Sequence, residues 1–194
     1  MKNKLNGRDF ITIGIFNAIS IVIYMAVAFV LATTVVGGFI ASGVAFMVVA
    51  ISYLLMGVKI KKRGVFTISG ILLGLIALSG GHIPHTIFAS LGGVVCDFII
   101  GNYESKGRII LGYGTFALAD FLGTVVPILL FGTSSFAERA AKWKMSEEQI
   151  NQAISYFSVP YTIGFGILTF ALACIGAFVA TKLLKKHFKK AGVI

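Results

Sequence analysis

The chain has 194 residues, of which 57% are hydrophobic and 12% charged, and its mean hydropathy is +0.94. A soluble domain carries about 25% charged residues, so the composition indicates a protein whose main solvent is lipid, in one integral membrane domain covering 1–194. The net charge of +10 does not indicate nucleic-acid binding, because the basic residues lie between apolar segments rather than in one basic region. No nucleic-acid partner is expected.

Six apolar segments predict six transmembrane helices, at about 10–33, 38–58, 64–79, 86–102, 109–131 and 159–181. These segments are far longer than the strands of a membrane barrel, and they do not alternate with polar residues. A helix also provides partners for its own backbone N–H and C=O groups in hydrocarbon. The expected fold is therefore an all-α membrane protein that spans the lipid bilayer.

The basic residues predict how these helices are oriented. With a cytoplasmic N-terminus, 14 of the 17 Lys and Arg residues fall on the cytoplasmic side. The other three lie in the connection 132–158. The positive-inside rule then places both termini in the cytoplasm and 132–158 outside. The basic closing segment KLLKKHFKKAGVI is expected to lie near anionic lipid.

The connection 132–158 has helical features of its own. The segment Ser146-Glu147-Glu148-Gln149 fits a capping box, and apolar residues recur at helical spacing from Ile150 to Phe157. The sequence predicts one short amphipathic helix here, on the outer face. Trp143, the only tryptophan, precedes this helix and is interpreted either as an interfacial anchor or as part of a cover over a ligand.

Motifs of nucleotide-binding and hydrolytic proteins are missing from the sequence. It contains no GxxxxGK[ST], no HExxH and no GxSxG. Cys96 and Cys174 have no CxxC spacing and are expected in the core. We therefore expect a protein that is not an enzyme, with no catalytic residues and no catalytic cofactor. If such a membrane protein is a transporter, its energy would come from a partner or an ion gradient.

Two histidines, His82 and His85, flank Pro84 at the predicted outer end of the third helix. The segment GGHIPH is expected to interrupt the helical pattern and to form an outer loop. Imidazole is a common ligand of Zn, Ni, Cu and haem iron. Two interpretations follow from the residues: a metal or ligand site, or loop histidines that bond to backbone or water.

Two acidic residues, Asp97 and Asp120, lie inside the predicted fourth and fifth helices. A charged group at this depth usually faces the protein interior or a cavity. One interpretation is proton coupling in a self-contained secondary transporter or channel, and the other is a polar clamp between helices. The sequence predicts no Lys, Arg or His beside them at that depth, which favours the clamp.

Small residues recur on the first predicted helix. Gly14 and Ala18 are four residues apart, as are Ala28 and Ala32. Such spacing lets two helices approach closely. It fits either packing inside the helix bundle or docking to another membrane subunit.

The segments RDFITIGIFNAI, KIKKRGVFTISGILLGL, GGHIPH and KLLKKHFKKAGVI resemble the Trep_Strep group of bacterial membrane proteins over nearly the whole chain. That group is similar to the substrate-binding S components of energy-coupling factor (ECF) transporters. The resemblance implies a six-helix protein of the bacterial plasma membrane that captures a small-molecule micronutrient from outside. It also implies three partner chains, a transmembrane T subunit and two cytoplasmic ATPase subunits.

The resemblance further implies roles for particular residues. Gly14 and Ala18 match the small-residue motif that contacts the T subunit in S components. The ligand pocket of such proteins would here be built by the loops 33–43, 80–86 and 132–158. The ligand-binding candidates in these loops are His82, Pro84, His85, Trp143 and Met145.

The composition of the same loops indicates what the ligand is. They are poor in charge and rich in Phe, Tyr, Ile and Val, which suits an apolar or aromatic molecule. Haem or a related tetrapyrrole, with Met145 or a histidine as axial ligand, is the first expectation. A vitamin-like aromatic molecule is the competing one. His82 and His85 are metal ligands only if the ligand is haem or a metal.

Overall fold

The computed structural model describes residues 4–79 and 81–185, which form eight helices and no strand. The six long helices are α1 (Gly7–Leu31), α2 (Val35–Ile60), α3 (Val65–Ser79), α4 (Ile83–Ile100), α5 (Lys106–Phe131) and α8 (Val159–Leu183). Two shorter helices, α6 (Ser134–Lys142) and α7 (Glu147–Tyr156), occupy the connection between α5 and α8.

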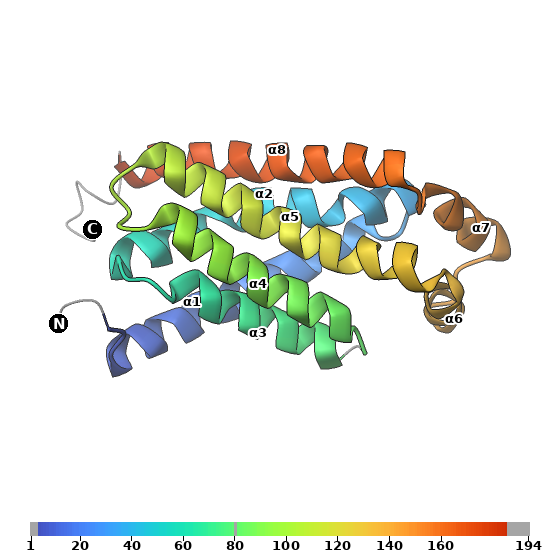
Figure 1. Ribbon diagram of the computed structural model, residues 1–194, viewed down its shortest axis with the longest axis horizontal. Helices are drawn as coiled ribbons and strands as arrows, with labels where there is room; N and C mark the ends of the chain where they lie inside the picture. Colours follow the sequence, from blue (N-terminus) through green and yellow to red (C-terminus); the bar gives the residue numbers. More distant parts are fainter. Residues whose placement is uncertain (1–3, 80, 186–194) are drawn as a thin grey trace.

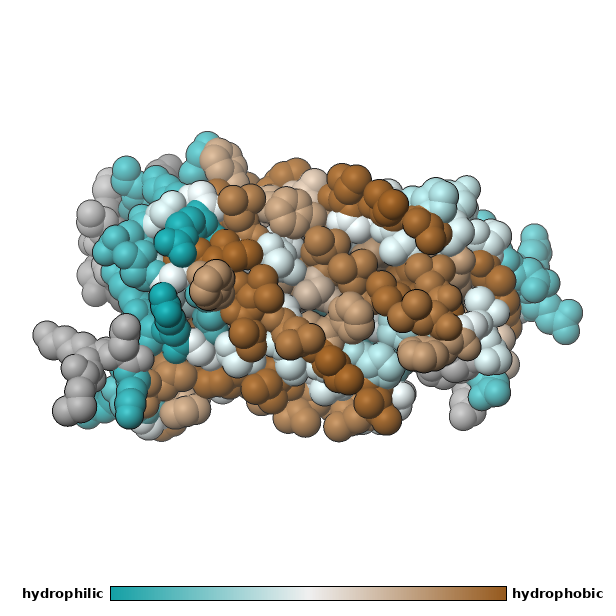
Figure 2. Space-filling view, in the orientation of Figure 1, coloured by the Kyte–Doolittle hydropathy of each residue, from teal (hydrophilic) through white to brown (hydrophobic). Residues whose placement is uncertain are grey.

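Among the described helices, five are long and apolar enough to cross a membrane: α1, α2, α4, α5 and α8. The apolar helix α3 has 15 residues and is about 22 Å long, shorter than a hydrocarbon core of about 30 Å. Figure 2 shows, on the face in view, apolar residues across the middle of the molecule and hydrophilic residues toward both ends. The prediction of an all-helical protein with several membrane-crossing helices is therefore confirmed.

The six long helices form a ring in which α1, α2, α8, α5, α4 and α3 are neighbours in that order (Figure 1). The ring closes because α3 also touches α1, and α2 meets α5 across its interior. Of the five apolar helices, α2 has the largest buried share, which agrees with this enclosed position.

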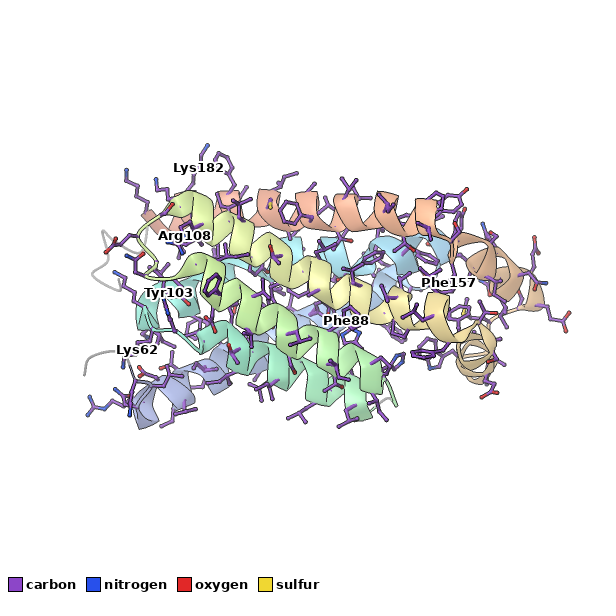
Figure 3. All side chains as sticks on the ribbon, in the orientation of Figure 1. Lys62, Phe88, Tyr103, Arg108, Phe157 and Lys182 are labelled. Atoms are coloured by element: carbon purple, nitrogen blue, oxygen red, sulfur yellow. The ribbon has the colours of Figure 1, made fainter. Side chains whose placement is uncertain are left out.

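The two ends of the ring carry different elements. The start of α1, the end of α8 and the α2–α3 and α4–α5 connections share one end, at the left of Figure 1, which we call the basic end. Figure 3 shows Lys62, Arg108 and Lys182 there, whereas Phe157 lies at the opposite end. We call α6 and α7, which lie over that opposite end, the cap.

Aromatic side chains fill the interior of the ring in the half nearer the basic end. The five fully buried rings are Phe46, Tyr53, Phe66, Tyr113 and Phe116. Their contacting centroids are 5.3–6.3 Å apart, within the range of favourable aromatic pairs. The Tyr113 hydroxyl donates to the Phe46 carbonyl oxygen at 2.7 Å, which satisfies this polar group inside the aromatic cluster.

The start of α4 differs from the sequence prediction. The interruption in the helical pattern ends before Ile83, so His85 lies in the first turn of α4 and not in a loop. Pro84 explains the difference, because proline is favourable in the first turn of a helix. Its fixed φ suits the helix, and its missing N–H would have no intrahelical partner there.

The connection 132–158 holds two helices where the sequence predicted one. The predicted helix is α7, and its capping box is present: Ser146 Oγ accepts from the Gln149 N–H, and Gln149 Oε1 accepts from the Ser146 N–H. The additional helix is α6. It has one large apolar residue, Phe136, and therefore gives no apolar repeat in the sequence.

Asp97 of α4 caps the start of α3. Its carboxylate accepts from the backbone N–H groups of Gly64, Phe66 and Thr67 at 3.0, 3.2 and 2.7 Å, and from the Thr67 hydroxyl at 2.8 Å. The first N–H groups of a helix have no intrahelical partner, and a negative charge interacts favourably with the helix dipole there. Asp97 therefore has the arrangement expected of a polar clamp between two helices.

Replacing Asp97 by alanine is expected to lower the free energy of unfolding by about 3 kcal/mol, because buried N–H groups at the start of α3 lose their acceptor. Reversible unfolding in mixed micelles, followed by circular dichroism, measures the change. Glu104→Ala removes an exposed carboxylate from the α4–α5 connection and is the control, with an expected change below about 0.5 kcal/mol. Equal stability of the two variants would contradict the capping role.

Candidate functional site

A cavity of about 230 Å³ lies between the ring and the cap. Aromatic rings supply much of its wall: Phe39 of α2, Phe121 of α5, Phe136 of α6 and Phe157, which directly follows α7. The volume is somewhat below the roughly 300–1,000 Å³ of sites for drug-sized ligands. The cavity therefore suits a compact and mainly apolar molecule.

Phe39 joins the cap to the ring. The centroid of its ring lies 5.5 Å from Tyr156, 5.1 Å from Phe157 and 5.2 Å from Phe165. The ring centroids of Phe136 in α6 and Phe157, directly after α7, are 4.9 Å apart, and this contact links the two helices of the cap. Offset and edge-on ring contacts of this kind are favourable, and they cover the cavity on the side of the cap.

Hydroxyl-bearing residues line the deep end of the cavity, and Asp120 of α5, which is 1% exposed, lies behind them. Its Oδ2 accepts from the hydroxyls of Tyr24 on α1 and Ser42 on α2, at 2.8 and 2.7 Å. Its Oδ1 lies 2.9 Å from Nε2 of His85 on α4. A buried carboxylate is costly unless donors surround it. The contacts supply those donors and join four helices at one group.

His85 contacts two residues of α5. Its Nε2 faces Asp120, and its Nδ1 lies 3.0 Å from Thr124 Oγ1, so both ring nitrogens have protein partners. The prediction that no histidine lies beside Asp120 is therefore wrong. The reason is the early start of α4, which turns His85 toward α5 instead of leaving it in an outer loop. No group of three or more metal-ligating side chains occurs among the described residues.

The structure divides the predicted ligand-binding residues between the cavity and its surroundings. His82, Trp143 and Met145 line the cavity, and Trp143 is 67% exposed, so it lies on the outer side. His85 lies behind the deep end, in contact with Asp120. Pro84 lies in the first turn of α4 and is not among the described residues of the wall.

Three hydroxyl-bearing residues that line the deep end of the cavity were not among the predicted ligand-binding residues: Tyr24, Ser42 and Thr124. Each is a polar residue within an apolar segment, which is a usable sign of an inward-facing group. The sequence does not show that they converge, because they lie on α1, α2 and α5. Asp120 and His85 are the residues that bring them to one place.

Gly14 and Ala18 lie on the outer surface of the ring. Both residues are exposed, and a Cβ added at Gly14 would meet no atom within 4 Å. Neighbouring Ile11 and Ile15 are 64% and 55% exposed, so this face of α1 is apolar and not covered by the described part of the chain. The interpretation of Gly14 and Ala18 as packing residues inside the bundle is therefore wrong.

Comparison with known proteins identifies one family. The model of a family described as "Hypothetical bacterial integral membrane protein (Trep_Strep)" matches residues 7–190. The resemblance to the Trep_Strep group found in the sequence motifs is thus confirmed. No curated protein and no solved structure gives a significant match.

A double-mutant cycle tests the contact between Asp120 and His85. Asp120→Ala is expected to lower the free energy of unfolding by about 3–5 kcal/mol, because buried donors lose their acceptor. In the His85→Ala background the same change should cost less, by about 1 kcal/mol or more, because one of those donors is already gone. Unfolding free energies of the four proteins give this coupling.

The control pairs His85→Ala with Asp97→Ala. Asp97 and His85 share no hydrogen-bond partner, so their effects on the free energy of unfolding should add. Additive effects for His85 with Asp120 as well would contradict their direct interaction.

Proposed function

The chain belongs to the Trep_Strep family of bacterial integral membrane proteins, and from this premise we propose that it is the substrate-capture (S) subunit of an ATP-driven ECF-type importer. The observation that carries the proposal is the apolar cavity between ring and cap, with a polar deep end. Small-molecule sites combine apolar walls and a few placed polar groups in this way. The sequence contains no nucleotide-binding loop, so ATP hydrolysis is assigned to partner subunits.

In this proposal all six long helices cross the plasma membrane, α3 as a short crossing. The basic end faces the cytoplasm, which the distribution of Lys and Arg supports. The cap then lies outside, and both termini lie inside. The cavity is reached from the extracellular side, where a capture subunit meets its ligand.

The proposed ligand is a compact aromatic or apolar molecule of vitamin size. The cavity volume of about 230 Å³ and the phenylalanine-rich wall support this class. Haem is less favoured. Its axial ligand would come from His82 or Met145, because both nitrogens of His85 already have protein partners.

The proposed partners are a T subunit in the membrane and two cytoplasmic ATPase subunits. Gly14 and Ala18 form the contact with the T subunit. Their exposure on an apolar face of α1 supports this role, because small residues let a partner helix approach closely.

A self-contained proton-coupled transporter or channel is the second candidate. One observation favours it: the Asp120–His85 pair lies next to the cavity, where it could exchange protons during transport. Asp97 has no part in this candidate, because its carboxylate serves the start of α3.

The protein purified from cells supplied with haem is expected to be colourless and to release a vitamin-sized molecule. The absorbance spectrum and mass spectrometry of the released material measure this. Gly38→Trp should abolish retention, because Gly38 lines the cavity and has open space beside it for an indole. Gly164→Trp is the matched control, since Gly164 of α8 also has open space but does not line the cavity.

Two outcomes would contradict this reading of the ligand or the function. A Soret band that weakens in His82→Ala would establish haem as the ligand. Uptake by vesicles that contain this chain alone, abolished by Asp120→Asn, would replace the importer with the proton-coupled transporter.

Gly14→Trp is expected to lower the amount of co-purified T subunit by about tenfold or more, because an indole on this face holds the partner helix away. Ligand retention should be unchanged, since Gly14 is exposed far from the cavity wall. Quantitative mass spectrometry of complexes expressed with the T subunit and both ATPases measures the change. Gly164→Trp is again the control, and an equal loss of T subunit in both variants would contradict docking at Gly14.

A further inference from the structure

Three hydroxyl-bearing residues line the deep end of the cavity: Tyr24, Ser42 and Thr124. Each hydroxyl has one hydrogen to donate and lone pairs that can accept. The direction of each hydrogen therefore decides what the cavity offers to a ligand. The partners behind the wall fix these directions.

Asp120 accepts hydrogen bonds from the hydroxyls of Tyr24 and Ser42. Its Oδ2 lies 2.8 and 2.7 Å from the two hydroxyl oxygens, and His85 approaches its other oxygen. Three donors around two oxygens suit the ionised carboxylate, which can only accept. Tyr24 and Ser42 must then donate to Asp120, and only their lone pairs remain for the cavity.

His85 accepts a hydrogen bond from the hydroxyl of Thr124. The nitrogen that faces the carboxylate, Nε2, carries a hydrogen, so in the neutral ring Nδ1 is an acceptor. The partner of Nδ1 is Thr124 Oγ1, at 3.0 Å, which donates to it. In a doubly protonated ring Nδ1 would donate to Thr124, whose own hydrogen could then point into the cavity. The hydrogen bonds from Tyr24 and Ser42 to Asp120 would be unchanged. At least two of the three hydroxyls therefore offer acceptors alone.

We propose that the deep end of the cavity presents hydrogen-bond acceptors and selects ligands whose inner end carries N–H or O–H donors. The ligand class is an aromatic or apolar molecule with an amine, amide N–H or hydroxyl at that end. A carboxylate or other acceptor there would meet the lone pairs of Tyr24 and Ser42. The inference rests on the proposed capture function and adds the chemistry that the site recognises.

The remaining polar side chains of the wall do not alter this selection. They are Thr34, His82 and Trp143. Thr34 and His82 lie in the α1–α2 and α3–α4 connections, and Trp143 follows α6, so all three lie toward the cap. They are placed to meet the outer end of a ligand, whereas Asp120 sets the polarity of the inner end.

A pair of probes of equal shape tests the proposal: 5-fluoroindole, which has an N–H donor, and 5-fluorobenzofuran, which has an oxygen in its place. Binding to washed protein in lipid nanodiscs is measured by ¹⁹F NMR, with empty nanodiscs as the correction for partition into lipid. The indole should bind about tenfold more tightly, as expected for one hydrogen bond that the furan cannot make.

Variants of the wall locate the effect. Tyr24→Phe and Ser42→Ala each remove one acceptor, and each should lower the indole-to-furan affinity ratio to about threefold or less. Tyr113→Phe is the matched control, because it removes a buried tyrosine hydroxyl from the aromatic cluster and not from the cavity. Its ratio should stay near tenfold.

The failure of this inference can be distinguished from failure of the capture function. Equal binding of the two probes, or tighter binding of the furan, overturns the acceptor assignment and leaves the cavity as a ligand site. An unchanged ratio in both Tyr24→Phe and Ser42→Ala also overturns it. Binding of neither probe above empty nanodiscs overturns the inference, and the release experiment with Gly38→Trp then decides the capture function.

Discussion

A carboxylate inside a ring of apolar helices needs donors on every side, and Asp120 draws them from three other helices. Tyr24, Ser42 and His85 reach it from α1, α2 and α4, so one buried charge fixes how four helices meet. An unpaired charge at this depth would be very costly, which makes the arrangement specific. The same contacts orient the hydroxyls that line the cavity. The packing of these four helices and the polarity of the cavity therefore both depend on Asp120.

The interior of the ring is filled in one half and hollow in the other. Near the basic end, five aromatic rings pack against one another and occupy the space between the helices. Toward the cap, phenylalanines line a space instead of filling it, and α6 and α7 cover that space. Packed aromatic side chains resist rearrangement, because cores have few voids. A ligand that enters from the side of the cap would thus meet Tyr24, Ser42 and Thr124, with Asp120 and His85 behind them, just before the packed aromatic core.

Apolar segments sufficed to predict the long helices, since these segments depend on composition over many residues. The start of α4 was missed because Gly81 and His82 suggested a loop, whereas Pro84 favours a first helical turn. That local difference hid the contact between His85 and Asp120. The convergence of Tyr24, Ser42 and Thr124 depends on helix packing across the ring, which one sequence does not encode in any spacing. The sequence analysis did identify residues of the cavity wall that lie in the connections between long helices, such as Trp143.

The two buried aspartates differ in whether a ligand in the cavity could affect their hydrogen bonds. Asp97 is bound by backbone N–H groups at the start of α3, whose positions are set by the helix itself. Asp120 is bound by the hydroxyls of Tyr24 and Ser42 and by an imidazole, and both hydroxyl-bearing residues also line the cavity. A donor placed on Tyr24 or Ser42 polarises the hydroxyl and strengthens its bond to Asp120, because hydrogen bonds in a chain reinforce one another. Under the proposed function, occupation of the cavity would therefore act on the junction of α1, α2, α4 and α5, whereas the Asp97 contacts at the start of α3 lie apart from the cavity wall.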